Sequence, residues 1–145
     1  MNQAFAKDVD EGLSASEKHL SSKYFYDEIG DGIFVEIMHM PEYYLTGAEY
    51  EILRNQSSKI IKNLGFNQSF NIVELGAGDG KKTIQLLKFL KKDNIPFVYQ
   101  PVDISEGAIN SLVENINQEI GSIDVQPLIG DYFNILQTLK DDEAP

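Results

Sequence analysis

The residues with the clearest chemical meaning form one short stretch, VELGAGDGKKT, which runs from Val73 to Thr83. An apolar run ends there in three glycines, Gly76, Gly78 and Gly80, and an amphipathic helical pattern follows. Glycine allows a backbone to turn tightly and to approach a ligand closely, and the first turn of the next helix offers unpaired N–H groups. Taken alone, the same spacing also fits an ordinary tight turn between a strand and a helix.

The spacing of these glycines argues against two classes of nucleotide site. A dinucleotide-binding turn reads G-x-G-x-x-G, but Lys81 stands at the place of its last glycine. A phosphate-binding P-loop needs a G-K-[ST] triplet in a fixed frame after an earlier glycine, and this stretch does not supply one. The G-x-G-x-G pattern therefore favours a ligand that has no pyrophosphate.

Two acidic sites follow the next two apolar runs. Asp103 closes the run FVYQPVD, where a carboxylate either accepts hydrogen bonds from ribose hydroxyls or only caps the next helix. Asp131 and Tyr132 follow the third run, where the acid can accept from an adenine amino group and the ring can cover the adenine. Alone, that pair is more often a helix cap beside a core tyrosine. Because the carboxyl ends of parallel strands meet at one edge, one adenosine lying across the three sites explains them together.

Residues 69–145 alternate between strand and helix patterns. Ser105 is the predicted N-cap of the second helix, and Pro101 predicts that its strand ends there or lies at an edge. The order predicts an α/β fold, with a truncated Rossmann-like parallel sheet of about three strands and right-handed crossovers. The predicted strands are residues 70–76, 96–103 and 123–131, and the predicted helices are residues 80–92, 105–121 and 132–140.

The first 68 residues predict a separate helical region. Capping-box pairs at residues 14–17 and 46–49 predict two helix starts, and Gly65 predicts the end of the second of these helices. Between them, two glycines at residues 30–32 predict a turn before a short helix that Pro41 ends. A dense aromatic group, which could simply pack this region on the sheet, consists of Tyr24, Phe25, Tyr26, Tyr43 and Tyr44.

The composition limits the partners and the compartment. The net charge is −11 and the pI is about 4.5, which argues against nucleic acid or an anionic membrane as a partner. The chain has no cysteine, and its two histidines, His19 and His39, lack metal-ligand spacing, so no disulfide and no metal site are predicted. The charged N-terminus and the lack of a long apolar run predict a cytoplasmic protein without a signal peptide or a membrane span.

The motifs occur in an order that resembles a known family, the histidine-specific, S-adenosylmethionine-dependent methyltransferases. The resemblance covers about residues 9–136. The family includes the histidine Nα-methyltransferase of ergothioneine biosynthesis. Its most specific part is the long N-terminal stretch, since many methyltransferases share a glycine turn. The motifs are KYFYDEIGDGIFVEIMHMPEYYLTGAEYEIL, then VELGAGDGKKT, PVDIS and GDY.

The resemblance implies S-adenosylmethionine as cofactor and methylation of the α-amino group of an amino acid, histidine in the first place. It implies no catalytic side chain, and it implies that the aromatic group forms a lid over the cofactor. It also assigns binding roles: Tyr26, Gly76 and Lys82 at the methionine end, Asp103 at the ribose, Asp131 and Tyr132 at the adenine, and Tyr43 at the substrate histidine.

Some features depart from the family and keep alternatives open. Gly47 stands where the family commonly has an arginine, and the glycine turn reads GDGKK where serines are frequent, so another small amine is an alternative acceptor. The family continues well past residue 145, which predicts that this chain is an incomplete portion and inactive alone. A half-sheet with an exposed edge strand predicts self-association. The remaining alternatives are a non-catalytic adenosine-binding or interaction module and, against the glycine spacing, a nicotinamide-dependent oxidoreductase.

Overall fold

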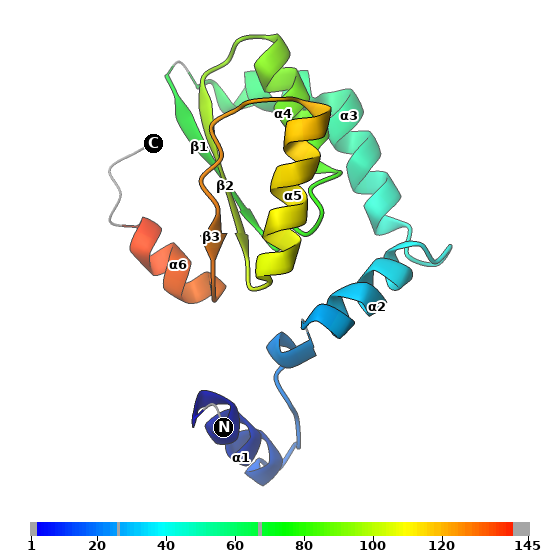
Figure 1. Ribbon diagram of the computed structural model, residues 1–145, viewed down its shortest axis with the longest axis vertical. Coiled ribbons are helices and arrows are strands. Elements are labelled where there is room, and N and C mark those ends of the chain that lie inside the picture. The colour runs from blue at the N-terminus through cyan, green and yellow to red at the C-terminus, as the bar shows by residue number, and fades with distance from the viewer. Residues whose placement is uncertain (1–2, 26, 67, 141–145) are drawn as a thin grey trace.

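Three parallel strands form the centre of the protein, as the sequence predicts. A computed structural model describes residues 3–25, 27–66 and 68–140. Strands β1 (Phe70–Leu75), β2 (Phe97–Asp103) and β3 (Leu128–Ile129) lie in the order β1-β2-β3 (Figure 1). The register places Phe70 opposite Phe97 and Leu75 opposite Val102. The third strand is much shorter than predicted, with one further bridge between Tyr99 and Val125.

Helices α3 (Leu45–Leu64), α4 (Thr83–Lys92) and α5 (Glu106–Glu119) cover one face of this sheet, and α6 (Tyr132–Leu139) lies on the other (Figure 1). The core lies between the sheet and the first group of helices, and α3 packs along α4. Each buried leucine or isoleucine contributes about 1.5–3 kcal/mol relative to an exposed one. The largest core side chains, Leu87, Leu90, Tyr99, Leu112 and Ile116, are almost fully buried.

Pro101 does not mark a strand end or an edge, and that prediction is wrong. It lies inside β2, the central strand. Tyr99 donates to and accepts from the third segment, and the Asp103 carbonyl accepts from the Gly130 N–H. The Val102 carbonyl, in contrast, accepts from the Gly76 N–H on the β1 side. Pro101 therefore faces the third segment, between the Tyr99 bridge and the short β3, where strand pairing is interrupted. The N–H that proline lacks is not needed at this place.

The N-terminal region forms α1 (Gln3–Ser14), a short 3₁₀ helix η1 (Ser22–Phe25) and α2 (Glu28–Met38). The helix start predicted from the capping box at residues 14–17 is wrong, because α1 ends at Ser14 and no helix begins there. The turn predicted at residues 30–32 is also wrong, since α2 runs through both glycines. Asp27 caps α2 by accepting from the Gly30 N–H at 2.8 Å. Gly30 is small for a packing reason, because a Cβ there would overlap the Phe25 carbonyl.

Helix α3 is confirmed, but it does not begin with the predicted capping box. Its N-cap is Tyr44, which makes no side-chain capping bond, and it ends at Gly65 with φ of 67°, as predicted. The Glu49 side chain pairs with Lys82 instead of turning back to cap its own helix. The predicted capping box fails because the helix begins at Leu45, which puts Thr46 inside its first turn.

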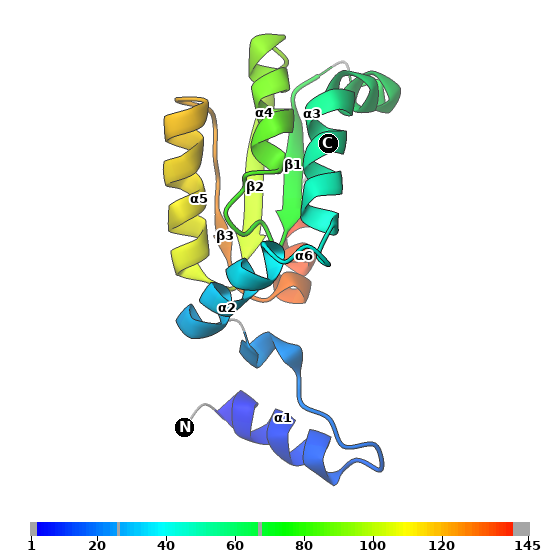
Figure 2. The same ribbon diagram turned by 90° about the vertical axis from the view of Figure 1, so that its right-hand side faces the viewer.

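Figures 1 and 2 show how the N-terminal helices sit relative to the sheet. In both views α2 lies beside the edge where the strands end, and α1 stands farther away. A cavity of about 330 Å³ lies between α1 and η1, and its lining is mostly apolar. Within the described ranges, no helix is both long enough and apolar enough to cross a membrane.

Candidate functional site

The glycine turn connects β1 to α4, and its three glycines are needed for different reasons. Gly76, Gly78 and Gly80 have φ values of 69°, 55° and 69°, a left-handed backbone that side chains rarely adopt. A Cβ at Gly80 would overlap the buried Leu112 of α5, and one at Gly76 would lie 2.9 Å from the Tyr132 hydroxyl. A Cβ at Gly78 would meet nothing within 4 Å. Gly78 is therefore the place where a ligand can approach this backbone.

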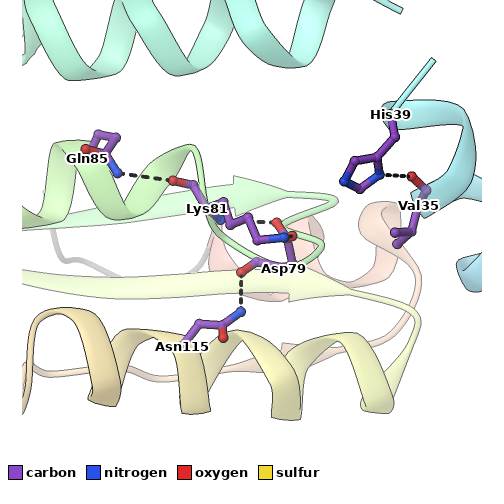
Figure 3. Close-up of polar contacts among 6 residues, drawn as sticks. All are labelled: Val35, His39, Asp79, Lys81, Gln85 and Asn115. Atoms are coloured by element: carbon purple, nitrogen blue, oxygen red, sulfur yellow. Dashed lines mark hydrogen bonds and ion pairs between the residues drawn. The ribbon is translucent and has the colours of Figure 1, made fainter.

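Neighbouring elements hold the turn by hydrogen bonds from several sides. The Gly76 N–H donates to the Val102 carbonyl of β2 at 2.8 Å. The Asn115 side-chain amide of α5 donates to the Asp79 carbonyl at 3.0 Å, and Lys81 forms an ion pair with the Asp79 carboxylate at 2.7 Å (Figure 3). These contacts fix the shape of the turn without a ligand.

Asp103 at the end of β2 lies against this turn, as predicted. One oxygen of its partly buried carboxylate accepts from the Gly78 N–H at 3.2 Å, and the other accepts from the Ser105 N–H at 3.0 Å. Ser105 caps α5 by accepting from the Ala108 N–H, which confirms its predicted role. A carboxylate has about four acceptor positions, so two protein donors leave Asp103 able to accept from ligand hydroxyls.

Asp131 and Tyr132 lie at the end of β3, and the structure gives them different roles. Asp131 is the N-cap of α6, and its Oδ1 accepts from the N–H groups of Phe133 and Asn134 at 3.1 and 3.3 Å. Tyr132 is not a core residue, because its side chain is 37% exposed. Its hydroxyl lies over Gly76, so the third strand end contributes an aromatic ring beside the glycine turn.

Lys82 brings α3 to the same place. It is the residue before α4, and its ammonium forms an ion pair with Glu49 of α3. Both side chains are partly exposed, so the ammonium remains accessible to a ligand. Of the predicted residues, Gly76 lies in the turn and Lys82 at its far end. Asp103 bonds to the turn, Tyr132 lies over it, and Asp131 directly precedes Tyr132.

The aromatic group of the N-terminal region does not form one cluster among the described residues. Tyr24 packs edge-on against Phe5 with ring centroids 4.8 Å apart, and Tyr43 packs edge-on against Phe34 at 6.0 Å. Phe25 is exposed, as is Tyr44. Tyr26, predicted to lie near the methionine end of the cofactor, falls outside the described residues.

Each histidine is held by its own segment. His39 at the end of α2 bonds through Nδ1 to the Val35 carbonyl at 2.7 Å and lies across from the turn in Figure 3. A carbonyl only accepts, so Nδ1 is the donor. His19 makes a similar bond to the Glu17 carbonyl. In the part of the chain that the structure describes, no three His, Cys, Asp or Glu side chains gather as metal ligands.

Sequence reasoning missed a polar group beneath the turn. Glu74 of β1 accepts from the Thr83 hydroxyl at 2.6 Å through one oxygen and from the Tyr99 hydroxyl through the other. Burial raises the pKa of Glu74, while the hydrogen bonds from Thr83 and Tyr99 act in the opposite direction. Burial, and then the Glu74 charge, raise the pKa of Tyr99 well above its ordinary value. The signal was the position of Glu74, which alternates with Phe70 and Ile72 on the core-facing side of a buried strand.

Comparisons with known proteins agree with this geometry. The chain matches the family described as histidine-specific methyltransferase, SAM-dependent, over residues 5–145. It is 35% identical over 130 residues to the histidine N-alpha-methyltransferase of Mycolicibacterium smegmatis, covering 90% of this chain and 40% of that protein. The corresponding protein of Mycobacterium tuberculosis is 33% identical over 129 residues, covering 89% of this chain and 39% of that protein.

A fungal relative has a less specific name. The N-methyltransferase fsqC of Aspergillus fumigatus is 30% identical over 126 residues, covering 84% of this chain and 34% of that protein. The chain thus spans 40% or less of the length of these three relatives. Because the family match extends over nearly all of its residues, the chain belongs to the histidine-specific, S-adenosylmethionine-dependent methyltransferases.

Proposed function

We propose that this chain is the cofactor-binding part of an S-adenosylmethionine-dependent N-methyltransferase that acts on the α-amino group of histidine. One observation carries the proposal. The unobstructed backbone at Gly78, the Asp103 carboxylate and the Tyr132 ring all lie at the same edge of the sheet. Family membership supports the cofactor, and the names of the two mycobacterial relatives support the acceptor.

The side chains present fit this cofactor. Asp103 keeps acceptor capacity for ribose hydroxyls, and Tyr132 offers a ring for the adenine, next to Asp131. Lys82 offers an ammonium to the methionine carboxylate, in place of its present partner Glu49. The methionine end would also approach Gly76 and Tyr26. We further propose that residues 1–68 cover the cofactor and that residues 69–145 bind it, because α2 lies beside the edge where the strands end (Figure 2).

The chemistry asks for positioning more than for reactive side chains. The cofactor would supply a methyl group bonded to a sulfonium sulfur. The lone pair of a neutral amine would attack that carbon in line as the carbon–sulfur bond breaks, so that S-adenosylhomocysteine leaves as a neutral thioether and the positive charge passes to the methylated nitrogen. Correct alignment of two reactants can contribute about 7–11 kcal/mol to such a step. In this proposal Asp103, Lys82 and the glycine turn align one reactant, and Tyr43 binds the acceptor histidine. The amine has to lose its ammonium proton to solvent before transfer, and a tyrosine hydroxyl or a water near the nitrogen can hydrogen-bond and orient the neutral amine.

A methyl-transfer assay tests the proposed function. The protein, as the cell produces it, is incubated with labelled S-adenosylmethionine and each amino acid in turn. We expect label on the α-nitrogen of histidine and none with Nα-blocked histidine. Transfer to another amine would retain the enzyme class but overturn the acceptor. Binding of the cofactor without transfer to any amine would favour the non-catalytic adenosine-binding module.

Another small amine is the second candidate acceptor. The observation in its favour is Gly47, where the family commonly has an arginine, and the printed name of the fungal relative specifies no amino acid. Two expectations from the sequence also remain proposals. One is a cytoplasmic location, and the other is self-association through the edge of β1.

A further inference from the structure

Glu74, Thr83 and Tyr99 form a three-residue polar group that the binding roles above do not use. Glu74 is the second-last residue of β1, Thr83 is the first residue of α4, and Tyr99 lies in the middle of β2. The glycine turn is the chain between the first two of these residues. One carboxylate therefore bonds to the far end of the turn through one oxygen and to the neighbouring strand through the other.

The surroundings of this group are mainly apolar. Thr83 is 6% exposed and Tyr99 is fully buried, and both lie beside the core side chains Ile84 and Leu87. Taking a carboxylate and two hydroxyls out of water costs free energy, and well-packed apolar residues in their place are often neutral or stabilising. Stability of the fold alone therefore does not account for a carboxylate at this place.

The geometry does account for it if the turn has to be held in shape. The hydrogen bond from Thr83 Oγ1 to the Glu74 carboxylate joins the two ends of the turn. The hydrogen bond from Tyr99 connects this carboxylate to β2. Val102 and Asp103, which bond to Gly76 and Gly78 from the same strand, then keep their spacing to the turn. Burial raises the pKa of Glu74, so its charged form depends on these two donors. Two further charges act on Glu74: Lys82 lowers its pKa and Glu49 raises it.

We propose that Glu74 is a positioning residue, whose hydrogen bonds to Thr83 and Tyr99 hold the glycine turn in the shape that receives the cofactor before the cofactor binds. This inference rests on the proposed function for the claim that the turn receives a cofactor. The claim that Glu74 holds the turn in shape does not depend on that function.

The test uses substitutions that remove a donor and keep the volume. Thr83→Val and Tyr99→Phe each remove one hydroxyl, Thr83→Ser retains it, and Glu119→Gln is a surface control. Amide hydrogen exchange is measured without ligand, and calorimetry measures binding of S-adenosylhomocysteine. We expect the amides of residues 78–82 to exchange on the order of tenfold faster in the valine and phenylalanine variants, with the dissociation constant higher by a similar factor. The serine and Glu119 variants should behave as wild type.

The outcomes separate this inference from the proposed function. If the wild type does not bind S-adenosylhomocysteine, the proposed function fails, and hydrogen exchange still decides whether Glu74 holds the turn. If the wild type binds and the valine and phenylalanine variants match it in affinity, the positioning role is wrong while the function stands. Faster exchange spread evenly over the turn and the core of α4 would also overturn it, because that result reports general loss of stability.

Discussion

Single residues in the glycine turn have distinct physical tasks, although the sequence pattern treats its glycines alike. Gly80 is small because α5 packs against it, and Gly78 is small where the surface is open. Of the three glycines, therefore, Gly78 alone leaves open space beside its Cα for a ligand. The sequence could not separate them, because Leu112 lies 32 positions beyond Gly80 and only the packing of α5 brings the two together.

Alanine substitutions distinguish these tasks. Gly80→Ala adds an overlap with Leu112 to the strain of its positive φ, so we expect the free energy of unfolding to fall by about 2–4 kcal/mol. Gly78→Ala adds only the strain of its positive φ, which should lower the free energy of unfolding by about 1–2 kcal/mol. It should weaken S-adenosylhomocysteine binding by more than this loss of stability explains. Urea unfolding and calorimetric titration of both variants measure this. Equal effects of the two substitutions on stability would contradict the packing role of Gly80.

The raised pKa of Glu74 predicts a pH dependence of stability. Burial raises this pKa above its ordinary value of 4.5, so the folded protein holds a proton that the unfolded chain releases. The contribution of Glu74 to stability is then complete below pH 4.5 and is lost as pH rises through the folded-state value. Relative to Glu74→Gln, the wild type should lose free energy of unfolding from pH 4 to pH 7.

A surface glutamate provides the control for that series. Hydrogen bonding to Lys88 lowers the pKa of Glu119, which gives the opposite sign, with stability lost as pH falls. Urea unfolding of Glu74→Gln, Glu119→Gln and wild type at four pH values compares the two. A difference between wild type and Glu74→Gln that stays constant with pH would show that Glu74 does not titrate as the structure indicates.

At the scale of elements, the features that depend on neighbouring residues were predicted correctly from the sequence, whereas those that depend on distant parts of the chain were not. The parallel order of the strands, the Ser105 cap of α5 and the Gly65 end of α3 follow from residues that are neighbours in the chain. Pro101 was misread because its tolerance depends on where β3 pairs. The capping box of α3 was misread because the helix already begins at Leu45, before Thr46. Of the candidate site, the residues at strand ends were predictable, but the contacts of Glu74 below them were not.

The contact between α1 and η1 supplies an element-scale prediction. Asp8 of α1 forms an ion pair with Lys23 at 2.5 Å and accepts from the Tyr24 hydroxyl at 2.7 Å. Hydrogen bonding to Lys23, and then to Tyr24, lowers the pKa of Asp8 below its ordinary value of 3.8. The contact should hold above pH 3.8 and weaken as pH falls through the lower folded-state value. The protection factors of the α1 amides, which correct for the slower chemical exchange in acid, should therefore fall at acid pH.

The variant Asp8→Asn removes this charge, with Asp10→Asn on the same helix as the control. At neutral pH the Asp8→Asn variant should already show the low α1 protection factors that the wild type shows only in acid. The exchange rates of α4 and α5 should not change in either variant. Protection of α1 that is equal in Asp8→Asn and wild type would mean that apolar contacts such as Phe5 with Tyr24 hold the helix alone.

At the scale of the whole molecule, the sheet has an accessible edge among the described residues. Strand β1 pairs with β2 only, and its side chains Val73 and Leu75 are 39% and 45% exposed. Gly76 bonds toward β2, so by alternation the N–H of Val73 points outward. An exposed strand of this kind is a template for pairing with another chain. The curated relatives that the chain matches are more than twice its length.

A substitution at this edge tests the predicted self-association. Val73→Pro removes an outward N–H without breaking the β1–β2 ladder, and Val73→Thr keeps both the N–H and the branched shape. Sedimentation of the 145-residue chain should show dimers or larger species for wild type and the threonine variant. The proline variant should sediment as a monomer. A monomeric wild type would contradict self-association through β1.

The central claim is that the glycine turn and Asp103 form an adenosine site, and calorimetric titration tests it most directly. S-adenosylhomocysteine is titrated into the protein as the cell produces it, with NAD as the comparison ligand and Asp103→Ala as the variant. The account predicts binding of S-adenosylhomocysteine alone, lost in the variant while its unfolding transition remains cooperative. Binding of NAD in preference, or equal S-adenosylhomocysteine affinity with and without the Asp103 carboxylate, would contradict it.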